Sequence, residues 1–178
     1  MSEWLDRFNE TAKLIQEGQY ADALDILNDL EPGIRAQPEL TSNTYVLFEL
    51  RRASLYSSLG LQEESLSRYQ SAMKLAFHEV QDPIEVQSVV KKTLDAICEW
   101  EEWKLLHTIS TNMMEFAQQQ NMPLVGVTAA WYLPYAYRGL GQMDQARQHA
   151  NEILKRLEES ESSDGIEGWR EFLKSLDE

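Results

Sequence analysis

The chain contains few of the residues that cross-link or interrupt a fold. Its 178 residues include one cysteine (Cys98), five prolines and eight glycines. A single cysteine excludes an internal disulfide and a zinc site built from several thiolates, and it favours a reducing compartment. Few glycines and prolines beside 43% hydrophobic residues argue against disorder and against a turn-rich β fold. We therefore expect an ordered, mostly helical, cytoplasmic protein.

Basic residues are also scarce, with 16 Lys and Arg against 30 Asp and Glu, a formal net charge of −14. Such a surface repels phosphate backbones, so we expect no nucleic-acid partner. The longest stretch without a charged residue, 116–137, includes the polar run 118–121 and two prolines, so it lacks the continuous apolar character of a membrane span. The first residues show no signal-peptide pattern. We therefore expect no membrane span, and a partner with basic flanks is favoured.

The residues that catalysis or metal binding would require are scattered. His78, His107 and His149 fall in different parts of the chain, and Cys98 has no motif around it. Phosphate-binding Gly-rich loops, His-x-x-x-His pairs and calcium loops are absent from the sequence. A catalytic site needs a nucleophile, a base and an orienting group together. We expect no enzyme activity, no catalytic residues, no metal site and no cofactor.

Apolar residues recur with helical spacing along almost the whole chain, and no segment alternates as a strand does. This spacing predicts four antiparallel helix hairpins and a terminal helix, at about 3–31, 41–80, 83–120, 123–158 and 164–177. The second helix is expected to end at Glu31-Pro32-Gly33. Asp82 is expected to cap a helix that starts at Pro83.

A single helix is expected from Pro123 to Tyr137. Within the hairpins, the breaks between the two helices are evenly spaced. Gly18, Gly60, Trp100 and Gly141 are separated by 42, 40 and 41 residues, and regular spacing of this kind is typical of a solenoid.

Three of these breaks are followed five positions later by a small residue, at Ala23, Ser65 and Ala146. A small residue there allows two helices to approach closely. The break at Trp100 departs from the pattern, since it has neither a glycine nor a small residue at these positions.

This pattern resembles the tetratricopeptide repeat in a long-period form of about 41 residues, similar to the repeats of kinesin light chains or of bacterial peptide-sensing regulators. The resemblance implies an all-α, right-handed α-solenoid of about four hairpins, in which residues 1–178 form one domain. The apolar stripe of the terminal helix is expected to cap the last hairpin. Alternatively, this helix lies in the protein's own groove or in the groove of a second copy.

The resemblance also implies a concave groove lined by the first helix of each hairpin. The residues expected to bind a partner there are Leu50, Ser54, Val90, Leu94, Trp131, Tyr135 and Arg138. A mixed, rather apolar groove of this kind suits an amphipathic helix or an extended apolar segment, and it argues against a clamp for a terminal carboxylate. Alternatively, Trp131 or Tyr135 fills the space between repeats.

The leading hypothesis is an adaptor or chaperone-like module that binds a peptide or helix of a protein partner. One alternative is a scaffold that self-associates, as a homodimer, through its terminal repeat or C-terminal helix. A second alternative is a peptide-sensing regulatory protein.

Overall fold

The structure is a computed structural model that describes residues 3–34, 40–80, 82–160 and 165–177. Across these ranges the regular secondary structure is helical, and no strand occurs in them. The all-α fold of helix hairpins is therefore confirmed. No helix in the described part of the chain has the length and apolar character needed to cross a membrane. Contacts divide the chain into two compact units, residues 1–89 (unit 1) and residues 90–178 (unit 2).

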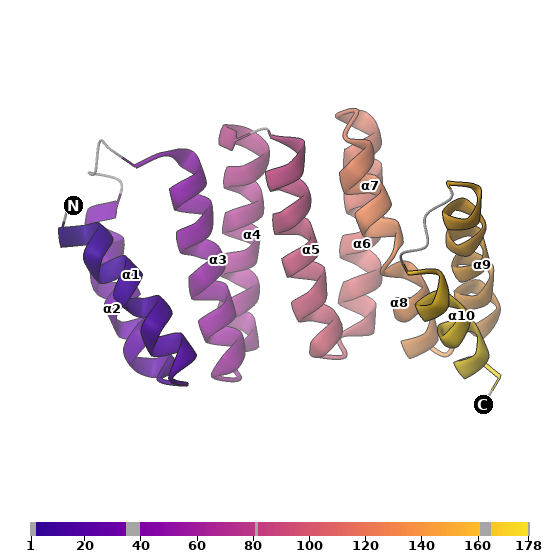
Figure 1. Cartoon of the computed structure of the whole chain (residues 1–178), viewed down its shortest axis with the longest axis horizontal. Coiled ribbons are helices and arrows are strands. Elements are labelled where there is room, and N and C mark those ends of the chain that lie inside the picture. The colour runs from indigo at the N-terminus through magenta and orange to yellow at the C-terminus, as the bar shows by residue number, and fades with distance from the viewer. Residues whose placement is uncertain (1–2, 35–39, 81, 161–164, 178) are drawn as a thin grey trace. The chain divides into compact units, whose positions relative to one another are not determined.

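Unit 1 consists of two antiparallel hairpins and the segments that follow them (Figure 1). Its elements are α1 (Glu3–Gln16), α2 (Tyr20–Ile34), α3 (Ser42–Ser58), α4 (Gln62–Leu75), the π-helical segment η1 (Ala76–Val80) and the first part of α5 (Pro83–Glu99). An aromatic cluster joins the two hairpins, because the ring of Phe8 lies 5.1 Å from Trp4 and 6.3 Å from Phe48. Leu27 and Leu55 complete this core.

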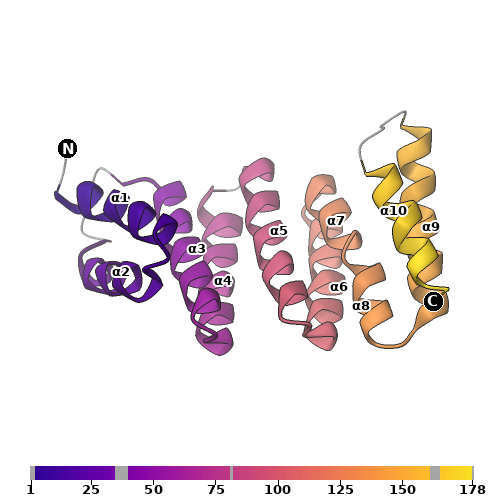
Figure 2. The same ribbon diagram turned by 60° about the horizontal axis from the view of Figure 1, so that its bottom comes forward.

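Unit 2 begins with the rest of α5 and ends with two helices that pack on each other (Figure 2). Its further elements are α6 (Trp103–Gln119), α7 (Pro123–Ala130), α8 (Leu133–Gly139), α9 (Met143–Glu159) and α10 (Ile166–Ser175). The ring of Trp103 lies directly against Gly139, in the space that a Cβ atom there would fill. The absence of a side chain at residue 139 therefore allows α6 and α8 to pack closely.

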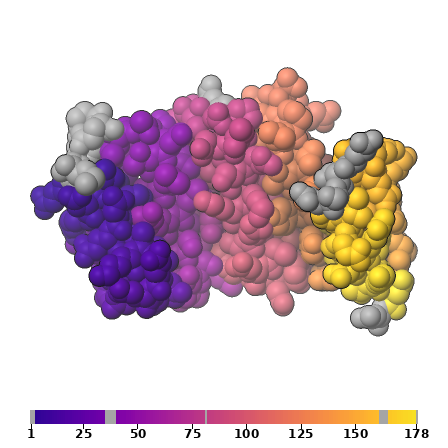
Figure 3. Space-filling model, viewed as in Figure 1, coloured from indigo at the N-terminus to yellow at the C-terminus, as the bar shows by residue number. Residues whose placement is uncertain are grey.

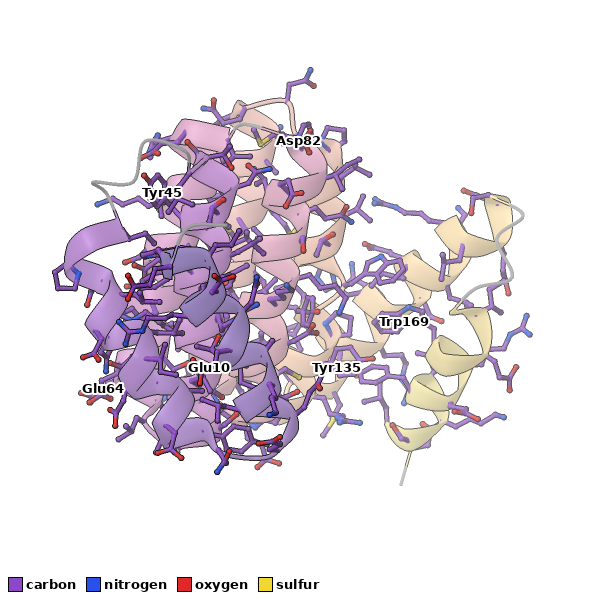
Figure 4. The ribbon with its side chains drawn as sticks, turned by 60° about the vertical axis from the view of Figure 1, so that its left-hand side comes forward. Glu10, Tyr45, Glu64, Asp82, Tyr135 and Trp169 are labelled. Carbon is purple, nitrogen blue, oxygen red and sulfur yellow. The ribbon has the colours of Figure 1, made fainter. Side chains whose placement is uncertain are left out.

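The start of α5 follows the prediction. The helix begins at Pro83, and the Asp82 carboxylate accepts hydrogen bonds from the backbone N–H groups of Ile84 (2.9 Å) and Glu85 (3.1 Å) (Figure 4). Asp82 thus satisfies two of the amide groups that a helix start leaves without intrahelical partners.

The turn inside each hairpin is closed by a residue in the left-handed conformation. The residues are Gly18, Gly60, Glu101 and Gly141, with φ of 75°, 75°, 58° and 74°. At each turn the next residue donates a backbone hydrogen bond to the carbonyl five positions earlier, as Glu102 does to Ile97 at 3.3 Å. This is the Schellman arrangement that ends many helices. The break expected at Trp100 therefore lies one residue later, at Glu101.

Two positions around each of these turns are buried in all four hairpins. The residues seven before and five after the left-handed residue are buried. Those before it are Thr11, Ala53, Leu94 and Pro134, and those after it are Ala23, Ser65, Leu106 and Ala146. The Ser65 hydroxyl donates to the carbonyl of Ala53 at 2.7 Å, so the two positions meet within one hairpin. With the turn placed at Glu101, the third hairpin follows the same burial pattern as the others.

Replacing Glu101 with glycine is expected to stabilise unit 2 by about 1 kcal/mol. A side chain in the left-handed region costs roughly 1–2 kcal/mol, and glycine removes most of that cost. Thermal and urea unfolding would measure the gain. The converse substitution, Gly60→Ala, serves as the control, because a Cβ atom there meets no atom within 4 Å and only the strain of φ +75° remains. A gain of stability in Gly60→Ala would contradict the explanation.

Two helix ends differ from the prediction, and both involve proline. α2 continues through Pro32 to Ile34 instead of ending at Glu31. A proline near the end of a helix removes only one intrahelical hydrogen bond, and Ile34 is 6% exposed. Burial of Ile34 therefore offsets the lost bond.

The helix expected from Pro123 to Tyr137 is instead broken into α7 and α8. Pro134 has no N–H to donate to residue 130, and its ring clashes with a helical carbonyl at that position. The backbone N–H of Trp131 is shared between the carbonyls of Val127 and Thr128, both at 3.2 Å, and that of Tyr132 bonds to the carbonyl of Ala129, three positions back, at 3.2 Å. The break therefore falls at Trp131 and Tyr132.

Candidate functional site

The exposed face of α7 is apolar. Leu124, Val127 and Trp131 have exposed fractions of 45%, 46% and 39%, and their spacing of three and four residues places them on one side of the helix. The opposite side is apolar too, since Val125 and Ala129 are fully buried. A helix that is apolar on all sides is expected to be buried. We call Leu124, Val127 and Trp131 the α7 face.

Aromatic rings from α8 and α10 pack beside the α7 face. The Trp169 ring lies 6.4 Å from Trp131 and 5.6 Å from Tyr135, and Phe172 lies 4.9 Å from Tyr135. Tyr135 and Trp169 point toward one another from α8 and α10 (Figure 4). Edge-to-face and tilted pairs at these distances add stabilisation beyond the area that they bury. α10 is therefore fixed against the two aromatic residues predicted to bind a partner.

Arg138 takes part in the same packing. Its guanidinium lies over the Phe172 ring, 5.1 Å from the centroid, and donates a hydrogen bond to the Ser175 hydroxyl at 3.3 Å. Trp131, Tyr135 and Arg138, three of the predicted groove residues, are thus brought together, and α10 lies against all three.

The predicted apolar stripe of the terminal helix covers the last hairpin. Trp169 and Phe172 are buried against Ile153, and Leu173 and Leu176 are partly buried in the same cluster. In the space-filling view the side chains of α10 lie against those of α9 (Figure 3). The capping helix is therefore confirmed. Asp164, at the expected start of this helix, lies outside the described residues.

The other predicted groove residues are mostly inaccessible. Leu50 is 7% exposed, whereas Val90 and Leu94 are fully buried. Ser54 is exposed on α3. A fully buried side chain contacts a partner only after its own surroundings rearrange, so Val90 and Leu94 act in the folded protein through packing.

A buried arginine in unit 1 was not predicted. Arg52 is 2% exposed; one guanidinium nitrogen lies 2.5 Å from a Glu31 carboxylate oxygen, and another donates to the Asn28 side chain at 3.0 Å. Phe48 and Leu55, four residues before and three after it, are both buried. Helical spacing therefore places Arg52 on the buried side of α3, which is the one signal in the sequence that could have revealed it.

The pKa values of two glutamates beside Arg52 are shifted in opposite directions. The hydrogen bond from Arg52 holds the pKa of Glu31 below its ordinary value, against the partial burial of the carboxyl group. Burial raises the pKa of Glu49, although Arg68 and Arg52 oppose the shift. Arg68 lies 3.0 Å from Glu31 and 3.5 Å from Glu49. The four side chains form one charged cluster of α2, α3 and α4.

Replacing Glu49 with glutamine is expected to change how stability depends on pH. Because the folded-state pKa of Glu49 is raised, its contribution is present at low pH and is lost as the pH rises through that pKa. The unfolding free energy of the wild type relative to Glu49→Gln should therefore fall between about pH 4 and pH 7. Urea titrations across that range measure it. A difference that grows with pH would show that Arg68 and Arg52 outweigh burial.

Other polar groups of unit 2 serve packing. The Tyr132 hydroxyl donates a hydrogen bond to Asp95, and burial followed by this bond raises the pKa of Tyr132. Burial also raises the pKa of the Cys98 thiol, which disfavours the reactive thiolate. The Tyr137 ring lies 5.1 Å from His107 and 5.2 Å from His149. Among the described residues, no group of three potential metal-ligating side chains is suitably placed.

Comparison with known proteins identifies the fold. No protein-family model matches the chain, and no curated protein matches its sequence. The structure is similar to the crystal structure of the apo form of RapI, with a TM-score of 0.80 and 12% sequence identity. The match covers 98% of this chain and 48% of the RapI chain, so this chain spans about half of RapI. At that identity the likeness shows the fold alone: the chain has a helical-repeat fold like that of RapI.

Proposed function

We propose that the chain is a tetratricopeptide-like module, of the long-period kind, that binds a polypeptide partner on the α7 face. The period of about 41 residues is supported by the left-handed residues at 18, 60, 101 and 141 and by the burial around them. The fold likeness to RapI supports the scaffold.

The observation that carries the proposed binding is the exposure of Leu124, Val127 and Trp131 on one side of α7. Adjacent large apolar side chains on a protein surface typically mark an interaction site, and a tryptophan is a frequent anchor of interfaces. Trp131 also lies at the edge of the α10 cluster, which holds its ring in place. A ring that is already ordered loses less entropy when a partner binds.

The partner proposed for this face is an amphipathic helix or an extended apolar segment. Either would place two or three apolar side chains on Leu124, Val127 and Trp131. The net charge of −14 favours basic residues on either side of that segment and speeds its approach at low salt. We propose a role in binding rather than in catalysis, as an adaptor, a chaperone-like module or a peptide-sensing regulator in the cytoplasm.

The double substitution Leu124→Ser and Val127→Ser is expected to reduce capture of the partner from a native cell extract at least tenfold. Both side chains are exposed, so the change removes apolar contact area while the fold is retained. Quantitative affinity capture with wild type and variant side by side measures the loss. Circular dichroism checks that the helices persist.

The matched control is Leu47→Ser on α3, since Leu47 is 49% exposed and belongs to unit 1. Partner capture should survive that change. Capture that is unaffected by the double substitution but lost in the control would contradict the proposal. A second copy of the chain could also occupy the α7 face. Light scattering of the wild type and the double variant tests this: a dimer that becomes a monomer in the variant would identify a second copy as the partner.

A further inference from the structure

A cavity of about 610 Å³ opens in unit 2 between α6, α7, α8 and α9. It arises from the break at Trp131 and Tyr132: α7 packs against α6, whereas α8 packs against α9 and α6. If residues 123–139 formed one straight helix, all of it would run alongside α9, as α8 does. Because α7 departs from that direction, the end of α9 near Arg156 forms the far wall of the cavity.

The walls of this cavity are mainly apolar. Its lining includes Met114 and Ala117 of α6, Val127 and Ala130 of α7, and Leu133 of α8, with Met122 at the turn before α7. Methionine side chains adapt to ligands of different shape. A volume of this size falls in the range of small-molecule sites, which are lined by apolar groups with a few polar groups that orient the ligand.

Arg156 is the positive group of the cavity lining. The other arginines that the structure describes are engaged: Arg7 with Asp29, Arg51 with the Phe8 carbonyl, Arg52 and Arg68 with Glu31, Arg138 with Ser175, Arg147 with Asp177, and Arg170 with Glu158. The guanidinium of Arg156 has no hydrogen bond, ion pair or ring contact with any residue in the described ranges. In a chain with almost twice as many acidic as basic residues, its guanidinium is open to an anion from outside.

We propose that this cavity binds a small amphipathic anion, with an apolar body about as long as a medium-length acyl chain and one carboxylate directed at Arg156. The apolar body would replace water along Met114, Val127 and Ala130. The guanidinium would form a charge-assisted hydrogen bond with the carboxylate. Glu115 on the α6 wall repels an anion, so the carboxylate is held on the α9 side. This small-molecule site differs from the α7 face, which is proposed to bind a polypeptide, although Val127 belongs to both.

Fluorescence titration with anilinonaphthalene sulfonate, followed by competition with decanoate or with neutral decan-1-ol, tests the site. Decanoate should displace the dye from the wild type. Arg156→Gln should weaken decanoate by about threefold to tenfold, as expected for one charge-assisted bond near the surface, and leave decan-1-ol unchanged. The matched control is Lys155→Gln, which removes the same charge from an exposed neighbour paired with Glu159, and it should bind decanoate as the wild type does.

Ala130→Phe should fill the cavity and weaken both competitors more than tenfold. Ala130→Leu serves if circular dichroism shows that the larger residue unfolds unit 2. Decanoate binding that is equal in wild type, Arg156→Gln and the filled variant would overturn the proposal, and so would an equal effect of Arg156→Gln on decanoate and decan-1-ol. Leu124→Ser changes the α7 face but no lining residue of the cavity. It should therefore weaken partner capture and leave decanoate binding unchanged, which distinguishes failure of this site from failure of the proposed function.

Discussion

Replacing Arg52 with alanine is expected to lower the unfolding free energy of unit 1 by about 2–4 kcal/mol, because a buried side chain and its hydrogen bonds are lost, whereas the Glu31 carboxylate is 40% exposed and stays partly solvated. Arg52 is 2% exposed, contacts Glu31 at 2.5 Å and donates to Asn28 at 3.0 Å. Its guanidinium also lies 5.5 Å from the Phe48 ring centroid. Alanine would leave a cavity, an unpaired Asn28 oxygen and a less neutralised pair of glutamates. Urea unfolding followed by circular dichroism measures the loss.

Two further variants separate charge from volume. Arg68→Ala removes a positive charge that contacts the same carboxylates, but Arg68 is 28% exposed, so a loss of about 1 kcal/mol is expected. Arg52→Met keeps most of the volume and removes the charge. If Arg52→Met proves as stable as the wild type, packing rather than ion pairing explains the burial. A loss below about 1 kcal/mol in Arg52→Ala would contradict the role of Arg52 in the core of unit 1.

The helical hairpins could be predicted from the sequence because their signals are local. Pro83 starts α5 after a capping Asp82, as predicted, and Gly60 and Gly141 close their turns with positive φ. The third turn was misplaced by one residue because Glu101 adopts a conformation that no sequence pattern attributes to glutamate. The spacing of apolar residues locates the helices, whereas the left-handed conformation of Glu101 is shown only by the structure.

The site was harder to predict because it depends on contacts between distant parts of the chain. Pro134 lies inside the segment that the helical spacing of apolar residues predicts to be one helix. Its effect on the backbone breaks the helix at Trp131 and Tyr132. The break creates the α7 face and the cavity beside Arg156. Arg52 was missed for a related reason, since a charged residue in an amphipathic helix normally lies on the exposed side.

Replacing Trp169 with alanine is expected to lower the unfolding free energy of unit 2 by about 3–5 kcal/mol, as for other buried large aromatic side chains. Trp169 is 5% exposed and contacts three rings, those of Trp131, Tyr135 and Phe172. Its removal takes away the ring of α10 that packs on Trp131, while Tyr135 keeps its contact with Phe172. Hydrogen exchange resolved by residue measures the effect, because it reports the two units separately.

The pattern of that loss distinguishes a fixed cap from a displaceable one. Lys174→Ala, on the exposed side of α10, is the control and should change stability by less than about 0.5 kcal/mol. If Trp169→Ala destabilises α9 and α8 together with α10, the helix is an integral part of the last hairpin. If only α10 loses protection, Trp131 and Tyr135 become accessible while the hairpin stays folded, and capture of the partner should then increase. We expect the first result. In the structure α10 contacts only the edge of the Trp131 ring and leaves Leu124 and Val127 exposed, so the α7 face can bind a partner while α10 stays in place.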